Sequence, residues 1–369
     1  MKFTCTQENL YKGLMKVQGL AHQATTLPIL KNIYIEVKNE ICTLKSTDLE
    51  IGISTTLRGK VEKEGSVTVD ARLMSNFVSL LPQDKITLVV DGDNSLSIKG
   101  GTHKTKIIGL SVEDYPVIPS IETQKGFILP ANEFKNALSQ IIPSVSSDDT
   151  RPELHGVLFR VAEKTLTLVG TDSYRLAERK VSIGENKNFT GSCIVPLKTI
   201  KELIRTLDDE ALQIEIYVAD NQILFIYGQT RMVSRLVDGQ YPDYEQIIPA
   251  SHTIQFTLSR DEFINAIKIS GLFASVGSNS VTLDISPQKR AITISSTALV
   301  GEEQTEITAD IEGENNLKII FDYRYLLDGL QSIEDADVVF AATVESAPVL
   351  LRPKEEPSAF IYIIMPIRQ

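Results

Sequence analysis

The segment FILPANEF, residues 127–134, occurs in three related copies along this 369-residue chain. The other copies are FTCTQENL at 3–10 and FTLSRDEF at 256–263, and their first residues are 124 and then 129 positions apart. Each copy starts with the alternation of a strand and continues with apolar residues at helical spacing, such as Leu10, Leu14 and Val17. A repeat of this length predicts three copies of one structural unit.

Two further patterns recur in the same order. A strand with a turn is written CTLKSTD at 42–48, LTLVGTD at 166–172 and ITISSTA at 292–298. A strand that runs into a second helix is written VDARLMSNFVSLL at 69–81, VPLKTIKELIRTL at 195–207 and FDYRYLLDGLQSI at 321–333. The patterns predict an α+β fold in which each unit lays two helices on antiparallel sheet. Proline-containing stretches near 112–120 and 239–249 place the domains at 1–122, 123–250 and 251–369.

Composition narrows the class of protein. The formal net charge of −11 argues against a protein that simply coats nucleic acid, although a local basic surface remains compatible with it. The chain has no apolar run long enough to span a bilayer and no signal-peptide core, so we expect a cytoplasmic protein without a membrane partner. Cys5, Cys42 and Cys193 are far apart and flanked by apolar residues, which predicts buried thiols and neither a disulfide framework nor a zinc site.

No catalytic constellation is recognisable. The chain lacks the glycine-rich phosphate loops, the GxSxG elbow, HExxH and paired CxxC motifs. The four histidines, at 22, 103, 155 and 252, occupy unrelated positions in the repeat, so surface or turn roles are favoured over metal binding. Asp48 and Asp172 are equivalent residues of separate units, and the third unit has Ala298 there. We therefore interpret these aspartates as turn residues and predict no catalytic residue, cofactor or metal site.

The charge is unevenly distributed. The six predicted repeat helices carry ten basic residues against seven acidic ones, although the whole chain is strongly acidic. If the helices share one face, that face is the least acidic surface and could lie against a polyanion. Ordinary solvated helix faces explain the same pattern equally well, so this observation alone leaves both interpretations open.

Several separated segments together resemble the bacterial sliding clamp family, the beta subunit of DNA polymerase III. They are MKFT at 1–4, LPIL at 27–30, STDLE at 46–50, TDSYRLA at 171–177, LVDGQYPDYEQIIP at 236–249 and MPIR at 365–368. The resemblance implies the DNA clamp fold and a closed ring made by a head-to-tail homodimer, with helices lining the hole. It further implies a processivity factor that encircles double-stranded DNA without sequence preference and tethers the DNA polymerase III alpha subunit, a clamp loader and repair proteins.

The resemblance also implies a pocket that binds short peptide motifs of these partners. Carried over by position, the pocket would comprise Arg151, Leu154, Thr171, Ser173, Tyr174, Arg175, Leu176, Pro242, Ile247, Asp322, Tyr325, Ser346, Pro348, Ile363, Met365, Pro366, Ile367 and Arg368. An apolar cleft with a flexible methionine suits hydrophobic anchors from many partners. The DNA-facing residues would be Lys12, Arg72, Lys198, Lys201 and Arg205, and the subunit contact would join Ile107 to Leu272 and Phe273 of the partner subunit.

The chain departs from the family in three places. Ser173 and Tyr174 stand where Gly-His is common, which should reshape one wall of the pocket. An aromatic pair is missing around 151–153, and Ala24 replaces a residue that can be basic, which puts specific DNA contacts there in doubt.

Two other functions stay open on the sequence. One is a repeat-built hydrolase with an active site at a domain junction, and it predicts titratable groups that converge in a cleft. The other is a monomeric scaffold that binds peptides without binding DNA.

Overall fold

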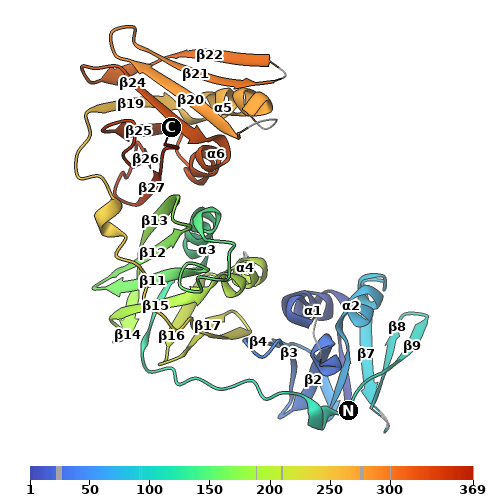
Figure 1. Cartoon of the computed structure of the whole chain (residues 1–369). Coiled ribbons are helices and arrows are strands. Elements are labelled where there is room, and N and C mark those ends of the chain that lie inside the picture. The colour runs from blue at the N-terminus through green and yellow to red at the C-terminus, as the bar shows by residue number, and fades with distance from the viewer. Residues whose placement is uncertain are drawn as a thin grey trace. The chain divides into compact units, whose positions relative to one another are not determined.

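The computed structural model describes residues 1–21, 27–90, 92, 94–187, 189–208, 211–274, 278–299 and 301–368 (Figure 1). Within them the chain forms two compact units. Unit 1 comprises Met1–Glu133, Ile183–Phe189 and Lys198–Leu236, and unit 2 comprises Phe134–Ser182, Thr190–Leu197 and Val237–Gln369. No helix in the described part of the chain is long and apolar enough to cross a membrane.

Unit 1 is built on two antiparallel sheets. The smaller has the order β5 (Lys60–Lys63), β1 (Lys2–Thr6), β7 (Lys85–Val90), β8 (Ser95–Gly100) and β9 (His103–Ile108). The larger has the order β14 (Glu185–Lys187), β10 (Gly126–Pro130), β16 (Gln213–Val218), β17 (Gln222–Tyr227), β18 (Thr230–Arg235), β4 (Ile51–Leu57), β3 (Ile41–Thr47), β2 (Asn32–Lys38) and β6 (Gly65–Asp70). Its helices are α1 (Gln7–Ala21), α2 (Ala71–Ser79), nearly all of α4 (Leu197–Thr206), and the 3-10 turns η1 (Pro28–Lys31) and η2 (Val112–Asp114).

Unit 2 is likewise built on two antiparallel sheets. Its larger sheet has the order β15 (Gly191–Pro196), β11 (Gly156–Ala162), β12 (Thr165–Thr171), β13 (Arg175–Ser182), β27 (Phe360–Ile364), β26 (Val349–Pro353), β25 (Asp337–Ala342), β19 (Ile254–Ser259) and β23 (Asp310–Glu312). Its smaller sheet has the order β22 (Gly301–Thr308), β21 (Ala291–Ala298), β20 (Ser280–Ser286) and β24 (Leu317–Asp322). Its helices are most of α3 (Ala131–Ile141), α5 (Arg260–Ala274), α6 (Tyr323–Ser332), η3 (Ile142–Ser144) and η4 (Glu245–Ile247).

The three repeated patterns fold as predicted. The first gives the strand-to-helix steps β1–α1, β10–α3 and β19–α5, and the third gives β6–α2, β15–α4 and β24–α6. The apolar helical positions predicted from the repeat, such as Leu10, Leu14, Phe134 and Phe263, are fully buried. Burial of one apolar stripe per helix supplies most of the stability of such a layer. The expected three-fold α+β repeat is thereby confirmed.

The sheets cross the repeats. Strands β10, β16, β17 and β18 of the middle repeat continue a sheet begun in the first repeat, and β11, β12 and β13 continue into the third. The compact units therefore follow sheets and not repeats, and the boundaries at 122/123 and 250/251 stay a prediction.

The thiols differ from one another in exposure. Cys5 and Cys42 are buried, as expected, and burial raises the pKa of the Cys5 thiol to about 12. Cys193 is only partly buried, because it lies in β15, the edge strand of its sheet. All three are free thiols.

Candidate functional site

The turn between β12 and β13 is organised by Thr171 and Asp172. Thr171 Oγ1 donates to the Arg175 carbonyl at 2.6 Å and accepts from the Ser173 N–H at 3.2 Å. Asp172 Oδ1 accepts from the N–H groups of Tyr174 and Arg175, each at 3.0 Å. These bonds hold Ser173 in the left-handed region, at a φ of 78°. The turn thereby presents Tyr174 to solvent, where 62% of its surface is exposed.

The first repeat contains the same turn. Asp48 Oδ1 accepts from the N–H groups of Glu50 at 3.0 Å and Ile51 at 2.7 Å, and Leu49 has a φ of 79°. Thr47 Oγ1 donates to the Ile51 carbonyl at 2.8 Å. The interpretation of Asp48 and Asp172 as turn residues is confirmed by these bonds.

Arg175 is the electrostatic centre of the site. Its Nε donates to Asp172 Oδ2 at 2.9 Å, its Nη1 binds Asp328 of α6, and its guanidinium lies 4.3 Å from the ring centroid of Tyr325. Its side chain is only 11% exposed. Burial would lower the pKa of this guanidinium, but the nearby Tyr362 and the two carboxylates outweigh burial and raise it. Arg175 is therefore a permanent cation that joins the turn to α6.

Aromatic and backbone contacts attach the last strand to this centre. The Tyr174 ring stacks on Tyr325 with centroids 6.3 Å apart, and Tyr362 Oη donates to the Tyr325 carbonyl at 2.7 Å. The Met365 N–H donates to the Tyr174 carbonyl at 2.8 Å, and the Ile367 N–H donates to the Ile320 carbonyl at 2.8 Å. The segment after β27 is thus held beside the turn, with Ile367 41% exposed.

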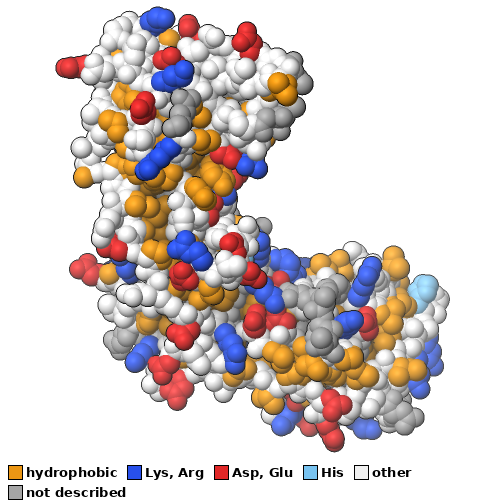
Figure 2. Space-filling view, viewed as in Figure 1, with side chains coloured by type: hydrophobic (Ala, Val, Ile, Leu, Met, Phe, Trp, Pro, Cys, Tyr) orange, Lys and Arg blue, Asp and Glu red, His pale blue; other side chains and the backbone are white. Residues whose placement is uncertain are grey.

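Most of the predicted peptide-site residues lie on this part of unit 2. Leu176 pairs with Ile363 across β13 and β27, and both are buried. Arg151 Nη1 donates to Ser173 Oγ at 3.1 Å, and the buried Leu154 donates to the Arg151 carbonyl. Figure 2 shows apolar side chains gathered over the region that carries β13 and β27 in Figure 1.

The other predicted residues join this group through their neighbours. Asp322 caps α6 by accepting from the Arg324 N–H at 2.9 Å, and Pro366 and Arg368 flank Ile367. Pro348 directly precedes β26, and Ser346 lies two residues before Pro348. Pro242 and Ile247 lie on a connector whose Tyr241 donates to the Val169 carbonyl at 3.3 Å.

The predicted DNA-facing residues of unit 1 fall into two classes. Lys12 pairs with Glu8 at 3.1 Å, and Lys198 pairs with Asp48 at 2.6 Å. Arg205 donates to the carbonyls of Met15 and Lys16 on α1 and to Glu202 on its own helix. The structure therefore uses Lys198 and Arg205 to join α4 to the first repeat. Arg72 and Lys201 are exposed helix residues without such a role in the described part of unit 1.

The predicted subunit contact is only partly on the surface. Ile107 is buried, with 4% exposure, whereas its neighbour Ile108 is 82% exposed. Alternation along β9 explains the difference, because successive side chains point to opposite faces of the sheet. Leu272 is 70% exposed, and Phe273 is half-buried.

Sequence reasoning missed the partners of Arg175. Asp172 could have been found from the turn that is shared with Asp48, but no local pattern links Arg175 to Asp328, which is 153 residues away. In the described residues, no three His, Cys, Asp or Glu side chains are grouped to hold a metal ion. His22 and Ala24 lie outside the described residues.

Comparisons with known proteins cover the whole chain. Models of the DNA polymerase III beta subunit match residues 1–119 (N-terminal domain), 128–243 (central domain) and 245–368 (C-terminal domain). The beta sliding clamp of Staphylococcus epidermidis is 32% identical over 100% of this chain and 99% of its own length. The crystal structure of the Bacillus subtilis DNA polymerase sliding clamp has 31% identity and a TM-score of 0.94, covering 100% of this chain and 99% of that one. The Pseudomonas aeruginosa clamp bound to griselimycin has 26% identity and a TM-score of 0.93, covering both chains fully.

Replacing Arg175 by Met should lower the free energy of unfolding by about 3 kcal/mol, because it leaves partly buried carboxylates without their cation. The matched control is Arg324→Met, which removes an arginine that is 54% exposed and should cost less than about 1 kcal/mol. Urea denaturation followed by circular dichroism measures both. Equal losses in the two variants would contradict the central role of Arg175.

Proposed function

The chain belongs to the DNA polymerase III beta subunit family, and we propose that it acts as a sliding clamp. Two subunits form a closed ring around duplex DNA and hold a polymerase at the primer end by raising its local concentration. The protein performs no catalysis itself and needs no cofactor. It works in the bacterial cytoplasm with a separate ATP-driven loader, because the chain has no nucleotide-binding loop of its own.

The observation that carries this proposal is the way in which the repeats join. Strand β18 of the second repeat pairs with β4 of the first, and β27 of the third pairs with β13 of the second. The strand of the first repeat that is equivalent to β18 and β27 is β9. The strand of the third repeat that is equivalent to β4 and β13 is β22. Both are edge strands in the described sheets. Exposed strand edges are templates for pairing, so the same junction can form a third time between two subunits.

The register of this third junction follows from the repeat. The first junction pairs Thr230 with Thr55. Thr230 and His103 are equivalent, because each is the first residue paired after a hairpin turn. Thr230 pairs with Tyr227, and His103 pairs with Gly100. Thr305 takes the place of Thr55 in the third repeat, so we infer that His103 lies opposite Thr305 of the partner subunit.

The charges of the two edges agree with this register. Lys106 would lie directly opposite Glu302, and Lys104 would lie diagonally between Glu302 and Glu306. All four side chains are exposed in the single chain. Opposite charges at directly facing positions stabilise an antiparallel pair, and like charges there destabilise it. The two edges are therefore complementary to one another and each repels a copy of itself.

Apolar surface accompanies both edges. Near β9, Ile108 is 82% exposed and Leu80, after α2, is 83% exposed. Near β22, Leu272 is 70% exposed and Leu299 is fully exposed. Large exposed apolar side chains are common at protein contacts. We propose that they pack together when the ring closes, with Phe273 completing the contact.

A ring of this kind needs little affinity for DNA. Topology keeps the protein on the duplex, so a few exposed cations such as Arg72 and Lys201 suffice for contact with phosphates. Tight neutralisation of many phosphates would oppose sliding. An overall charge of −11 is compatible with this function.

For the partners, we propose that their short peptide motifs bind at the surface around Tyr174. The exposed ring of Tyr174, Met365 and the exposed Ile367 offer apolar contacts, and Arg175 supplies a fixed charge behind them. Such a combination accepts hydrophobic anchors from several partners. The DNA polymerase III alpha subunit, the clamp loader and repair proteins are the partners that we expect.

The ring is tested by retention on nicked circular DNA after loading with a matched clamp loader and ATP. We expect the protein to stay on the circle and to leave after the circle is linearised, because a ring slides off free ends. Equal behaviour on circular and linear DNA would support a hydrolase or a monomeric scaffold instead.

The peptide site is tested with Tyr174→Ala and a fluorescent peptide that carries a clamp-binding motif. Loss of an exposed aromatic anchor should weaken binding about tenfold, or about 1.4 kcal/mol. The control is Tyr34→Ala, which removes one ring of the Tyr34–Tyr115 pair in unit 1. Anisotropy titrations with unchanged affinity for the Tyr174 variant would refute this location.

A further inference from the structure

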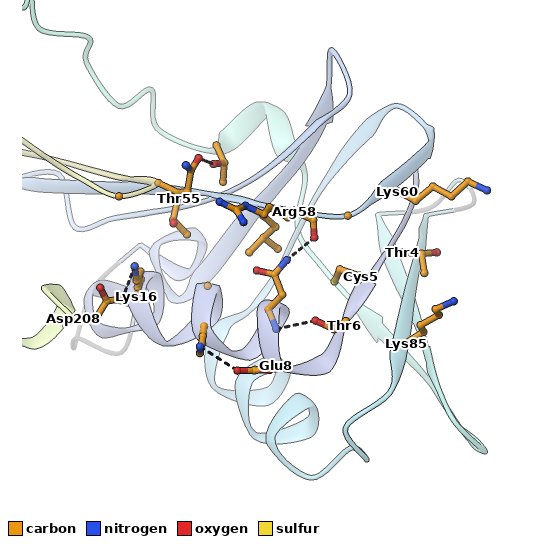
Figure 3. A pocket seen from close by; sticks show the side chains of 18 of the residues that line it. Thr4, Cys5, Thr6, Glu8, Lys16, Thr55, Arg58, Lys60, Lys85 and Asp208 are labelled. Carbon is orange, nitrogen blue, oxygen red and sulfur yellow. Dashed lines mark hydrogen bonds and ion pairs between the residues drawn. The ribbon is translucent and has the colours of Figure 1, made fainter. Parts of the chain in front are cut away.

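A groove of about 830 Å³ lies beside the start of α1 in unit 1 (Figure 3). Its walls are the end of β1 with the first turns of α1, the β4–β5 turn, the start of β7 and the β17–β18 turn. None of the predicted peptide-site residues lines it, and of the predicted DNA-facing residues it includes Lys12.

Hydrogen bonds fix the shape of the groove. Asn9 Nδ2 donates to the Arg58 carbonyl at 2.5 Å, and the Asn9 N–H donates to Thr6 Oγ1 at 3.3 Å (Figure 3). Thr56 Oγ1 donates to Gln229 Oε1 at 2.8 Å and so ties β4 to the β17–β18 turn. The β4–β5 turn is therefore held against the first turn of α1.

The groove has an excess of positive charge. It is lined by five basic residues, Lys12, Lys16, Arg58, Lys60 and Lys85, and by two acidic ones, Glu8 and Asp208. Each acidic residue is already paired, Glu8 with Lys12 at 3.1 Å and Asp208 with Lys16 at 2.8 Å.

The three remaining cations are exposed. Arg58 and Lys85 form no ion pair within the described residues, and Lys60 lies near Glu62, whose carboxylate already pairs with Lys2 at 2.8 Å. Arg58, Lys60 and Lys85 are thus available to an anion from outside.

Their arrangement favours a chain of phosphates over a single small anion. Figure 3 shows that Lys60 and Lys85 extend on the Thr4 side of the groove, whereas the Arg58 guanidinium points back over α1. The positive charges are spread along the groove and do not converge on one point. Hydroxyl and amide groups of Thr4 and Gln229 lie among them. Such side chains commonly donate to phosphate oxygens in DNA complexes.

We propose that this groove binds the phosphodiester backbone of duplex DNA, with Arg58, Lys60 and Lys85 as the phosphate contacts. The inference rests on the proposed clamp function, in which the helices line the hole around the duplex. Arg58, Lys60 and Lys85 can contact the duplex because they are not engaged within the described part of the protein. Lys198 and Arg205, in contrast, already bind other parts of unit 1. An acidic protein segment is the alternative occupant, but such interfaces also need apolar anchors, and Leu57, an apolar residue that lines the groove, is buried.

The test compares the triple variant R58Q/K60Q/K85Q with the control K164Q/K289Q/K318Q, which removes the same charge from exposed positions outside the groove. Binding of the unloaded protein to a fluorescent 20-base-pair duplex is measured by anisotropy over a range of low salt concentrations. The plot of log K against log salt should be less steep by about 2 to 3 in the groove variant, since each lost phosphate contact removes about 0.9 from the magnitude of the slope. Affinity at the lowest salt concentration should fall at least tenfold, and the control should match the wild type.

Equal binding by the groove variant and the control would overturn the inference, as would the absence of any duplex binding by the wild type. Preferential loss of polyglutamate binding, with duplex binding unchanged, would assign the groove to an acidic protein segment and also overturn it. Retention on circular DNA tests the clamp function separately, because a ring without this groove still encircles the duplex. Melting curves of all three proteins verify that the substitutions leave the fold intact.

Discussion

Pairing of strand edges between successive repeats is the interaction on which the rest of the structure depends. The junctions β18–β4 and β27–β13 turn the half-sheets of three repeats into two continuous nine-stranded sheets. Each junction satisfies backbone groups that would otherwise be exposed, and it uses equivalent strands in both cases. A chain of three such repeats therefore leaves two of these strand edges unpaired in the described sheets, β9 of the first repeat and β22 of the third. The proposed ring follows from joining these two edges in a second copy of the chain.

Side chains reinforce the two internal junctions in different ways. At the first, Lys198 pairs with the turn aspartate Asp48, and Arg205 binds carbonyls of α1. At the second, Arg175 joins its own turn aspartate to Asp328 on α6. The same turn thus anchors a cation at both junctions, although the cation comes from a different element each time. The second arrangement also exposes Tyr174, which explains why we assign peptide binding to that junction.

The repeat was predictable from the sequence because it consists of patterns among neighbouring residues. Strand alternation, helical spacing and the Thr-Asp turn each involve fewer than about fifteen neighbouring residues, within which periodicity is informative. The burial of Leu10 and Phe134 and the turn bonds of Asp48 follow directly from these patterns. The resemblance to a known family then supplied the candidate site residues.

Features that depend on distant partners were not predictable. Arg205 was expected to face DNA, but its guanidinium binds backbone carbonyls nearly two hundred residues away. The pairing of Arg175 with Asp328 and the groove beside α1 likewise assemble from separate segments of the chain. Burial within β9 is a smaller example, since Ile107 is buried and the neighbouring Ile108 carries the exposed apolar surface.

The central claim is that β9 of one subunit pairs with β22 of another, and native mass measurement of charge-reversed variants tests it most directly. The first variant is K104E/K106E and the second is E302K/E306K, so each alone places like charges across both junctions. The account predicts that the wild type has twice the mass of one chain, that each variant alone is a monomer, and that an equal mixture forms a dimer of one copy of each. Stable dimers of either variant alone, or a mixture that stays monomeric while the wild type is a dimer, would contradict it.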